Sequence, residues 1–202
     1  MANIPCTGPV LVACRHVHHL DDGVSLLAVF PRPLHIVVAL DWATNLAGHA
    51  FMRLICTVAQ WPVILRHHNA RRSAFTPAQR KRYLQRASRE VVALLRKNRV
   101  IVMFPEGWPN VDPSWTPKKG VDDKLAFEQG FVRLVALAER GGHPAVAIVP
   151  AGLYYPADGR RSVTLRFGEA MFTNANGRRE LLQLIEQRVA ELSQPPRAEP
   201  DG

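Results

Sequence analysis

Short apolar runs alternate with segments of helical spacing along most of this chain, and this alternation constrains the fold more than any other feature. Runs typical of buried strands cover 9–14, 35–40, 63–65, 100–104 and 145–149. Strands that alternate with helices predict an α/β protein, layered αβα, with a mostly parallel central sheet flanked by helices. The run at 162–167 alternates apolar and polar residues, so we expect a half-exposed strand there. A strand near the end of the chain could be antiparallel to the others.

The clearest helix begins at Thr76-Pro77. Thr76 can cap the free amides of the first turn, Pro77 fits that turn, and Gln79 completes a capping box. Further helices are expected at 23–30, 44–58, 123–140 and 178–192, with the strand at 145–149 broken by Pro150. The pattern predicts a single domain over 1–193 and a polar, Pro-rich tail over 194–202 that we expect to be disordered.

The composition favours an anionic partner. The formal net charge is +9 and 47% of residues are hydrophobic, which suits a folded protein that meets nucleic acid, an anionic membrane or a phosphorylated substrate. The three cysteines have no metal-binding spacing and suggest a reducing, cytosolic compartment. No secretory signal and no apolar run of membrane-spanning length is visible, so we expect a soluble or peripheral protein.

Three polar clusters follow expected strands, at 15–22, 66–72 and 105–110. Ligands bind beyond the carboxyl ends of the strands in parallel sheets, so we expect the three clusters to converge on one cleft. His16 and Asp21 stand out in the first cluster. On a continuous helix they would diverge by about 140°, but they can meet if a turn separates them and Asp21 begins the next helix.

In that geometry the carboxylate of Asp21 would hold one imidazole nitrogen of His16, and the other nitrogen would take a proton from an attacking hydroxyl. The same cluster leaves a second interpretation open. His16, His18 and Asp21 could instead bind a metal ion in a metal-dependent hydrolase.

Several motifs, in a fixed order along the chain, resemble those of a known protein family. His16-Val-His-His-Leu-Asp21 fits the H-x(4)-D signature, and Phe104-Pro-Glu-Gly107 fits the F-P-E-G block of glycerolipid acyltransferases of the lysophosphatidic acid acyltransferase type. Later blocks also follow that family's order. They are the helix motif Phe127-Glu-Gln-Gly-Phe131, the Pro-ended strand Val146-Ala-Ile-Val-Pro150 and the late Phe167-Gly-Glu169. The resemblance extends over nearly the whole chain.

The resemblance implies transfer of a fatty acyl group from acyl-CoA or acyl carrier protein to the hydroxyl of a lysophospholipid or related lipid alcohol. His16 would be the general base and Asp21 its partner, with no cofactor and no metal. Arg66, Glu106 and Gly107 inherit a role in acceptor binding, and Pro150 a structural role beside the site. The family also implies a cytoplasmic protein that works peripherally at the inner face of the membrane, without nucleic acid.

One block departs from the family pattern. F-P-E-G is usually followed by Thr-Arg-Ser or a similar run, whereas Trp108-Pro-Asn110 stands here, and the missing Arg is a typical phosphate contact. Basic residues elsewhere could replace it: Arg66, Arg71, Arg72, Lys118 or Lys119. A non-catalytic basic module for membranes or nucleic acid is a third interpretation, although no RNA motif, zinc finger or recognition helix is visible.

Overall fold

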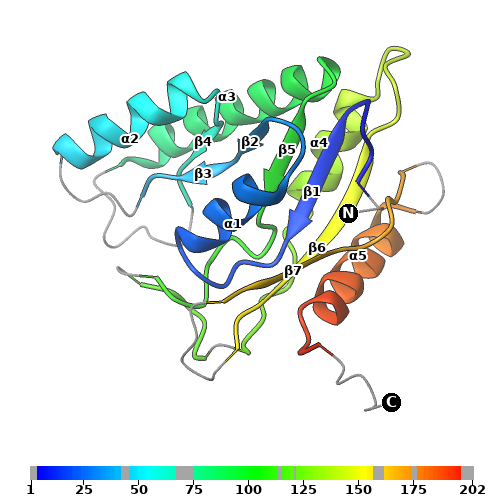
Figure 1. Cartoon of the computed structure of the whole chain (residues 1–202). Helices are drawn as coiled ribbons and strands as arrows, with labels where there is room; N and C mark the ends of the chain where they lie inside the picture. The colour runs from blue at the N-terminus through cyan, green and yellow to red at the C-terminus, as the bar shows by residue number, and fades with distance from the viewer. Residues whose placement is uncertain are drawn as a thin grey trace, which may run out of the picture.

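A five-stranded sheet forms the centre of the computed structural model (Figure 1). The structure describes residues 4–41, 46–66, 75–112, 115–120, 122–156, 162–173 and 177–196. The strand order is β2-β5-β1-β6-β7, and every neighbouring pair is parallel except β6 and β7. The strands are β1 (Val10–Cys14), β2 (Leu34–Ile36), β5 (Val100–Met103), β6 (Ala147–Tyr154) and β7 (Thr164–Phe167). The mostly parallel sheet with one late antiparallel strand confirms the prediction.

Helices cover both faces of this sheet (Figure 1). Leu11 and Ala13 of β1 pack on one face, against α3 (Pro77–Arg96), α4 (Gly130–Ala138) and α5 (Arg178–Leu192). Val10, Val12 and Cys14 point to the other face, where α1 (Asp21–Val29) packs with Leu26 and Phe30. The period of two along β1 therefore separates the two cores and gives the predicted αβα layering.

The helix expected after Thr76 forms as predicted. Thr76 accepts a hydrogen bond from the Gln79 backbone, and the Gln79 side chain accepts one from the Thr76 backbone, so the capping box is complete. The last helix has the expected bounds, Arg178–Leu192.

The run at 35–40 was expected to be one strand, but it splits between two sheets. β2 pairs with β5, and the backbone N–H of Val37 still donates to Val102 O. Because β5 ends at Met103, the next residues find their partner elsewhere: β3 (Val38–Ala39) pairs with β4 (Val63–Ile64) in a separate parallel ribbon. The helix α2 (Leu46–Val58) connects these two strands, and the first residues expected in it, Thr44 and Asn45, lie outside the described residues.

The helix expected at 123–140 is shorter than predicted, since α4 covers only Gly130–Ala138. The backbone N–H of Leu125 donates to Glu106 Oε2, and that of Glu128 donates to Pro105 O. These amides serve the loop after β5 instead of a helical turn. Phe127 therefore lies before the helix, although it still packs in the same core as Phe131.

The strand expected to break at Pro150 continues through it to Tyr154. The backbone N–H of Ile148 points to Met171, away from β1, so the nitrogen of Pro150, two residues later, faces the same side. The proline thus removes no donor from the β1–β6 ladder, and Pro150 O still accepts from the Gly168 N–H.

Within the described ranges, no helix is both long and apolar enough to cross a bilayer. The single-domain boundary at residue 193 and the disordered tail stay predictions, because 197–202 lie outside the described residues.

Candidate active site

At least one residue from each of the three polar clusters lies at a common cavity, beyond the carboxyl ends of the strands; of the cluster at 66–72, only Arg66 is among the described residues. His16 follows β1, Gly107 follows β5 and Arg66 follows β4, and all three line a cavity of about 190 Å³. Most of the remaining lining is apolar and comes from α1, α2, the β3–β4 ribbon and the end of β5, with Leu20, Val24, Leu27, Val38, Met52, Ile64 and Met103 among it. The cavity therefore brings the imidazoles of His16 and His19 and the guanidinium of Arg66 to a largely apolar space.

His16 is held on several sides. Its ring stacks on Phe104 with centroids 4.1 Å apart, and its Nδ1 lies 2.8 Å from Asp22 Oδ2. Its backbone N–H donates to Glu106 Oε1 at 3.3 Å, and its carbonyl accepts from Lys118 Nζ at 3.0 Å. The contact with Asp22 leaves Nε2 as the ring nitrogen available to a substrate.

The carboxylate that holds His16 belongs to Asp22, where the motif had indicated Asp21. Helix α1 begins at Asp21, two residues before the predicted start, so both aspartates lie in its first turn. Neighbouring helical residues point about 100° apart, and only one of the two can face the loop. Asp22 is fully buried and faces the loop, whereas Asp21 is exposed. The Asp21-Asp22 doublet was the available signal, but the motif spacing favoured its first member.

The carboxylate of Asp22 contacts three successive residues of the loop before α1. Oδ2 accepts from Val17 N at 2.6 Å as well as contacting His16, and both oxygens lie 3.1 Å from the backbone nitrogen of His18. Tyr155, just beyond β6, donates its hydroxyl to Asp22 Oδ1 at 2.7 Å. The position of Asp22 at a helix N-terminus also favours its negative charge. Burial and the neighbouring Asp22 carboxylate raise the pKa of the Tyr155 phenol well above its ordinary range.

The arrangement does not assemble the metal site considered above. The ring of His18 lies edge-on to Tyr155, with centroids 4.5 Å apart, and the Asp22 carboxylate is occupied by N–H and O–H donors. Among the described residues, no group of three His, Cys, Asp or Glu side chains is placed to share a metal ion.

Glu106 and Lys118 form a buried ion pair behind His16. Glu106 Oε2 lies 2.7 Å from Lys118 Nζ, and both side chains are almost completely buried. Lys118 Nζ also donates to Asn110 Oδ1 at 3.1 Å. Burial lowers the pKa of Lys118, and the Glu106 carboxylate opposes that shift. With both oxygens of Glu106 engaged inside the protein, the geometry favours a role in positioning His16; its expected contact with the acceptor stays a prediction.

Arg66 lies in the cavity wall with its charge already partnered. Its Nε contacts both carboxylate oxygens of Asp41, at 3.1 and 3.0 Å, and its Nη1 donates to Gly107 O at 3.3 Å. The guanidinium lies 3.6 Å from the ring centroid of Trp108, and Nη2 lies 3.9 Å from Asp112 Oδ2. Within the described part of the chain, that buried Nη2 has no hydrogen-bond partner, so it can donate to a ligand.

The departures from the family block thus have structural roles. Trp108 is the surface on which Arg66 lies, and Asn110 holds Lys118 while its Nδ2 donates to the carbonyls of Gly120 and Asp123. Lys118, one of the candidates to replace the missing Arg, is buried beside Glu106. Arg71 and Arg72 lie outside the described residues.

Gly107 and Pro150 occupy positions that suit their backbones. Gly107 has φ +73°, a region that L side chains rarely adopt, and its N–H closes a turn on Phe104 O. Pro150 is buried in β6 and pairs with Ala13 of β1, which lies three residues before His16 in the chain; its structural role beside the site stays a prediction. His19, which sequence reasoning did not assign to the substrate site, also lines the cavity, and burial lowers its pKa.

The chain is similar to known acyltransferases in sequence and in fold. A family model described as Acyltransferase matches residues 1–154. The chain is also similar to a crystal structure of the 1-acyl-sn-glycerophosphate (LPA) acyltransferase PlsC from Thermotoga maritima. The two are 17% identical, and the match covers 94% of this chain and 67% of that one with a TM-score of 0.57, which establishes the common fold. A comparison with curated proteins gave no significant match.

Proposed function

Since this chain belongs to the acyltransferase family, we propose that it transfers a fatty acyl group from a thioester donor, acyl-CoA or acyl carrier protein, to the hydroxyl of a lysophospholipid or related lipid alcohol. The observation that carries the proposal is the His16–Asp22 pair, 2.8 Å apart, at the wall of a largely apolar cavity. An imidazole held through Nδ1 by a buried carboxylate is suited to take a proton at Nε2.

The reaction follows from that arrangement. Nε2 of His16 removes the proton of the acceptor hydroxyl as its oxygen attacks the thioester carbonyl. The carbon–sulfur bond then breaks, and the proton passes from His16 to the departing thiolate. Asp22 stabilises the imidazolium that forms in between, and the hydrogen bond from Tyr155 keeps that carboxylate in place. No covalent intermediate with the protein is needed.

Arg66 is the candidate contact for the polar end of the acceptor. Its Nη2 is buried in the cavity wall, while Asp41 and the ring of Trp108 fix the direction of the guanidinium. The apolar lining contributed by α1 and α2 suits an acyl chain. An acceptor with its hydroxyl at His16 and its head group at Arg66 would therefore contact two of the polar side chains that line the cavity.

We also propose that the protein works on a membrane surface, at its cytoplasmic face. Two exposed apolar stripes support this: Leu20, Val24 and Leu27 on and just before α1, and Phe51, Leu54 and Val58 on α2. Each stripe has the spacing of a single helix face. The α1 stripe also lines the cavity, so a lipid could reach His16 from the bilayer without crossing water. The three cysteines are free, in keeping with a reducing compartment.

The test of the activity is an acyl-transfer assay. Purified protein is incubated with palmitoyl-CoA or palmitoyl carrier protein and with lysophosphatidic acid, other lysophospholipids or a neutral lipid alcohol, and thiol release and product mass are followed. His16→Ala should lower transfer by about 10²–10⁴-fold. His143→Ala, at an exposed position after α4, is the matched control and should keep full activity. Full transfer by His16→Ala would refute the assigned mechanism.

The test of the membrane surface uses vesicles that contain anionic lipid. Phe51→Glu/Leu54→Glu should weaken vesicle binding in cosedimentation by about 100-fold or more, because each of the two side chains contributes about 1.5–3 kcal/mol when buried. Leu137→Glu/Leu184→Glu makes the same change on α4 and α5 and should bind as the wild type does. Equal binding by both double variants would show that the α2 stripe is not part of the docking surface.

A further inference from the structure

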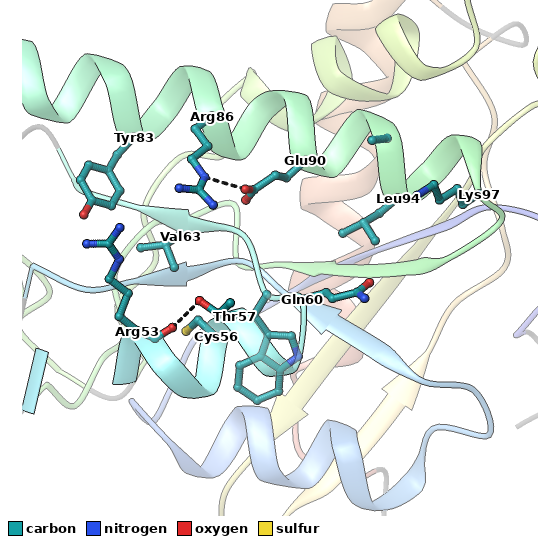
Figure 2. A pocket seen from close by; sticks show the side chains of 12 residues that line it. Arg53, Cys56, Thr57, Gln60, Val63, Tyr83, Arg86, Glu90, Leu94 and Lys97 are labelled. Atoms are coloured by element: carbon teal, nitrogen blue, oxygen red, sulfur yellow. Dashed lines mark hydrogen bonds and ion pairs between the residues drawn. The ribbon is translucent and has the colours of Figure 1, made fainter. Parts of the chain in front are cut away.

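A second cavity, larger than the one at His16, lies between α2 and α3 (Figure 2). Its volume is about 310 Å³, against about 190 Å³ for the cavity at His16. Residues of α2 form one wall, residues of α3 form the other, and Val63 of β4 lies between them. We call it the α2–α3 groove. Neither the motifs nor the proposed reaction uses it.

Cationic side chains from both walls line the groove. Figure 2 shows the guanidinium of Arg53 rising from α2 and that of Arg86 extending from α3 into the same space, with Lys97 at one end. Among the described residues, Glu90 is the single carboxylate in the lining, and its Oε1 lies 2.7 Å from Arg86 Nε. These three cations and one carboxylate give the groove a net positive charge. An anion bound between the two walls would offset the repulsion between the cationic side chains.

The rest of the groove is apolar and partly aromatic. Tyr83, Trp61 and Leu94 contribute side chains to the lining, and the guanidinium of Arg53 lies 6.0 Å from the ring centroid of Tyr83. Flat apolar surface next to guanidinium groups suits a ligand that joins a flat or apolar body to a phosphate. The volume is of the size that small-molecule sites have.

We propose that the α2–α3 groove is a second binding site, for a phosphorylated ligand whose body is flat or apolar. Arg53 and Arg86 contact the phosphate from opposite walls, and the body lies against Tyr83, Trp61 and Leu94. Two sources carry this chemistry: the nucleotide of a CoA thioester, and the head group and first carbons of an anionic phospholipid.

The groove is separate from the cavity at His16 but adjoins it. Val63 lines the groove and Ile64 lines the other cavity, as expected because successive residues of a strand point to opposite faces. Trp61 lines both, and its Nε1 donates to Leu34 O at 3.1 Å. A ligand in the groove therefore contacts a side chain that also shapes the substrate cavity.

Isothermal titration calorimetry tests the proposal without acyl transfer. The probes are adenosine 3′,5′-bisphosphate for the nucleotide, monomeric dihexanoyl phosphatidic acid for the lipid, and inorganic phosphate as the reference without a body. Arg53→Gln/Arg86→Gln should weaken binding of the effective probe by about 100-fold, close to tenfold for each guanidinium. Lys81→Gln/Arg89→Gln is the control, since it makes the same change of charge at exposed positions of α3 outside the groove.

The proposal is supported if either organic probe binds the wild type and the control but not the groove variant. The organic probe that binds more tightly identifies the source. His16→Ala should bind that probe like the wild type; if it does not, the ligand occupies the other cavity and the proposal is wrong. Three further results overturn it. They are no binding of either organic probe up to about 1 mM, an equal loss of affinity in the groove variant and the control, or inorganic phosphate that binds as tightly as the two organic probes.

Discussion

Asp22→Asn is the sharpest test of the site, because the change keeps the shape of the side chain while removing its charge and one of its two acceptor oxygens. Every group that meets this carboxylate is a donor: the His16 ring, the backbone amides of Val17 and His18, and the hydroxyl of Tyr155. An amide accepts through one atom only, so its NH₂ must face a donor whichever way it is turned. Losing two hydrogen bonds to a charged group, at about 1.5–3 kcal/mol each, should lower the free energy of unfolding by about 3–6 kcal/mol.

The expected effect on activity is separate from that loss of stability. With His16 no longer held by a carboxylate, kcat should fall by about 10²-fold or more. Asp21→Asn is the matched control: the residue is exposed one position earlier on the same helix, so its stability should change by less than about 0.5 kcal/mol and its kcat little.

Both variants are assayed with palmitoyl-CoA and the preferred acceptor, well below the lower of the two Tm values, with circular dichroism to confirm that each is folded. A folded Asp22→Asn protein with wild-type kcat would refute the argument. An inactive Asp21→Asn protein would refute it as well, because that result would favour Asp21, the residue that the H-x(4)-D motif indicates, as the partner of His16.

Three further predictions concern the residues around the pair. Lys118→Met should lower the free energy of unfolding by about 3–5 kcal/mol, since it leaves the Glu106 carboxylate buried without its cation, and Lys118→Met/Glu106→Gln should recover part of that loss in thermal unfolding. If the double variant is no more stable than the single one, the ion pair is not the cause. Arg66→Lys keeps the charge but loses the stacking on Trp108, so steady-state kinetics should show KM for the acceptor rising more than kcat falls; an unchanged KM would contradict the assigned contact. Tyr155 keeps its proton in the folded state above the ordinary phenol pKa of 10.0, so its contribution to stability is present below that pH and is lost as the pH rises beyond it. The free energy of unfolding, measured in urea, should therefore fall less between about pH 9 and 11 for Tyr155→Phe than for the wild type. An equal fall in the two proteins would contradict the raised pKa.

Much of the fold could be read from local patterns. The capping box at Thr76, the bounds of the last helix at 178–192 and the alternating core residues of β1 all depend on side chains within a few positions of each other. The order of strands and helices also predicted that the three polar clusters would converge, and His16, Arg66 and Gly107, one residue of each cluster, line the same cavity. Backbone geometry alone sets these spacings, so they are visible without any tertiary contact.

The elements that sequence reasoning misplaced depend on distant partners. The segment at 123–129 has helical spacing, yet its amides bond to the loop after β5, and the run at 35–40 divides because β5 offers no partner beyond Met103. Pro150 marks a strand end in local terms, but β6 continues because its missing N–H faces away from β1. Local propensity is overridden where a tertiary hydrogen bond competes for the same backbone group.

The contact between His16 and Asp22 shows the same division at atomic scale. The sequence placed an imidazole and an acidic helix start next to each other, but the angle at which α1 leaves the loop decided that Asp22 would face His16 and Asp21 would face solvent. The backbone of His16 is held by Glu106 and Lys118, which are 90 and 102 positions away, and no periodic pattern records such a contact. Local spacing determines which side chains share a helix face or a strand face, whereas a buried charge takes its partner from whichever chain segment packing brings within hydrogen-bond distance.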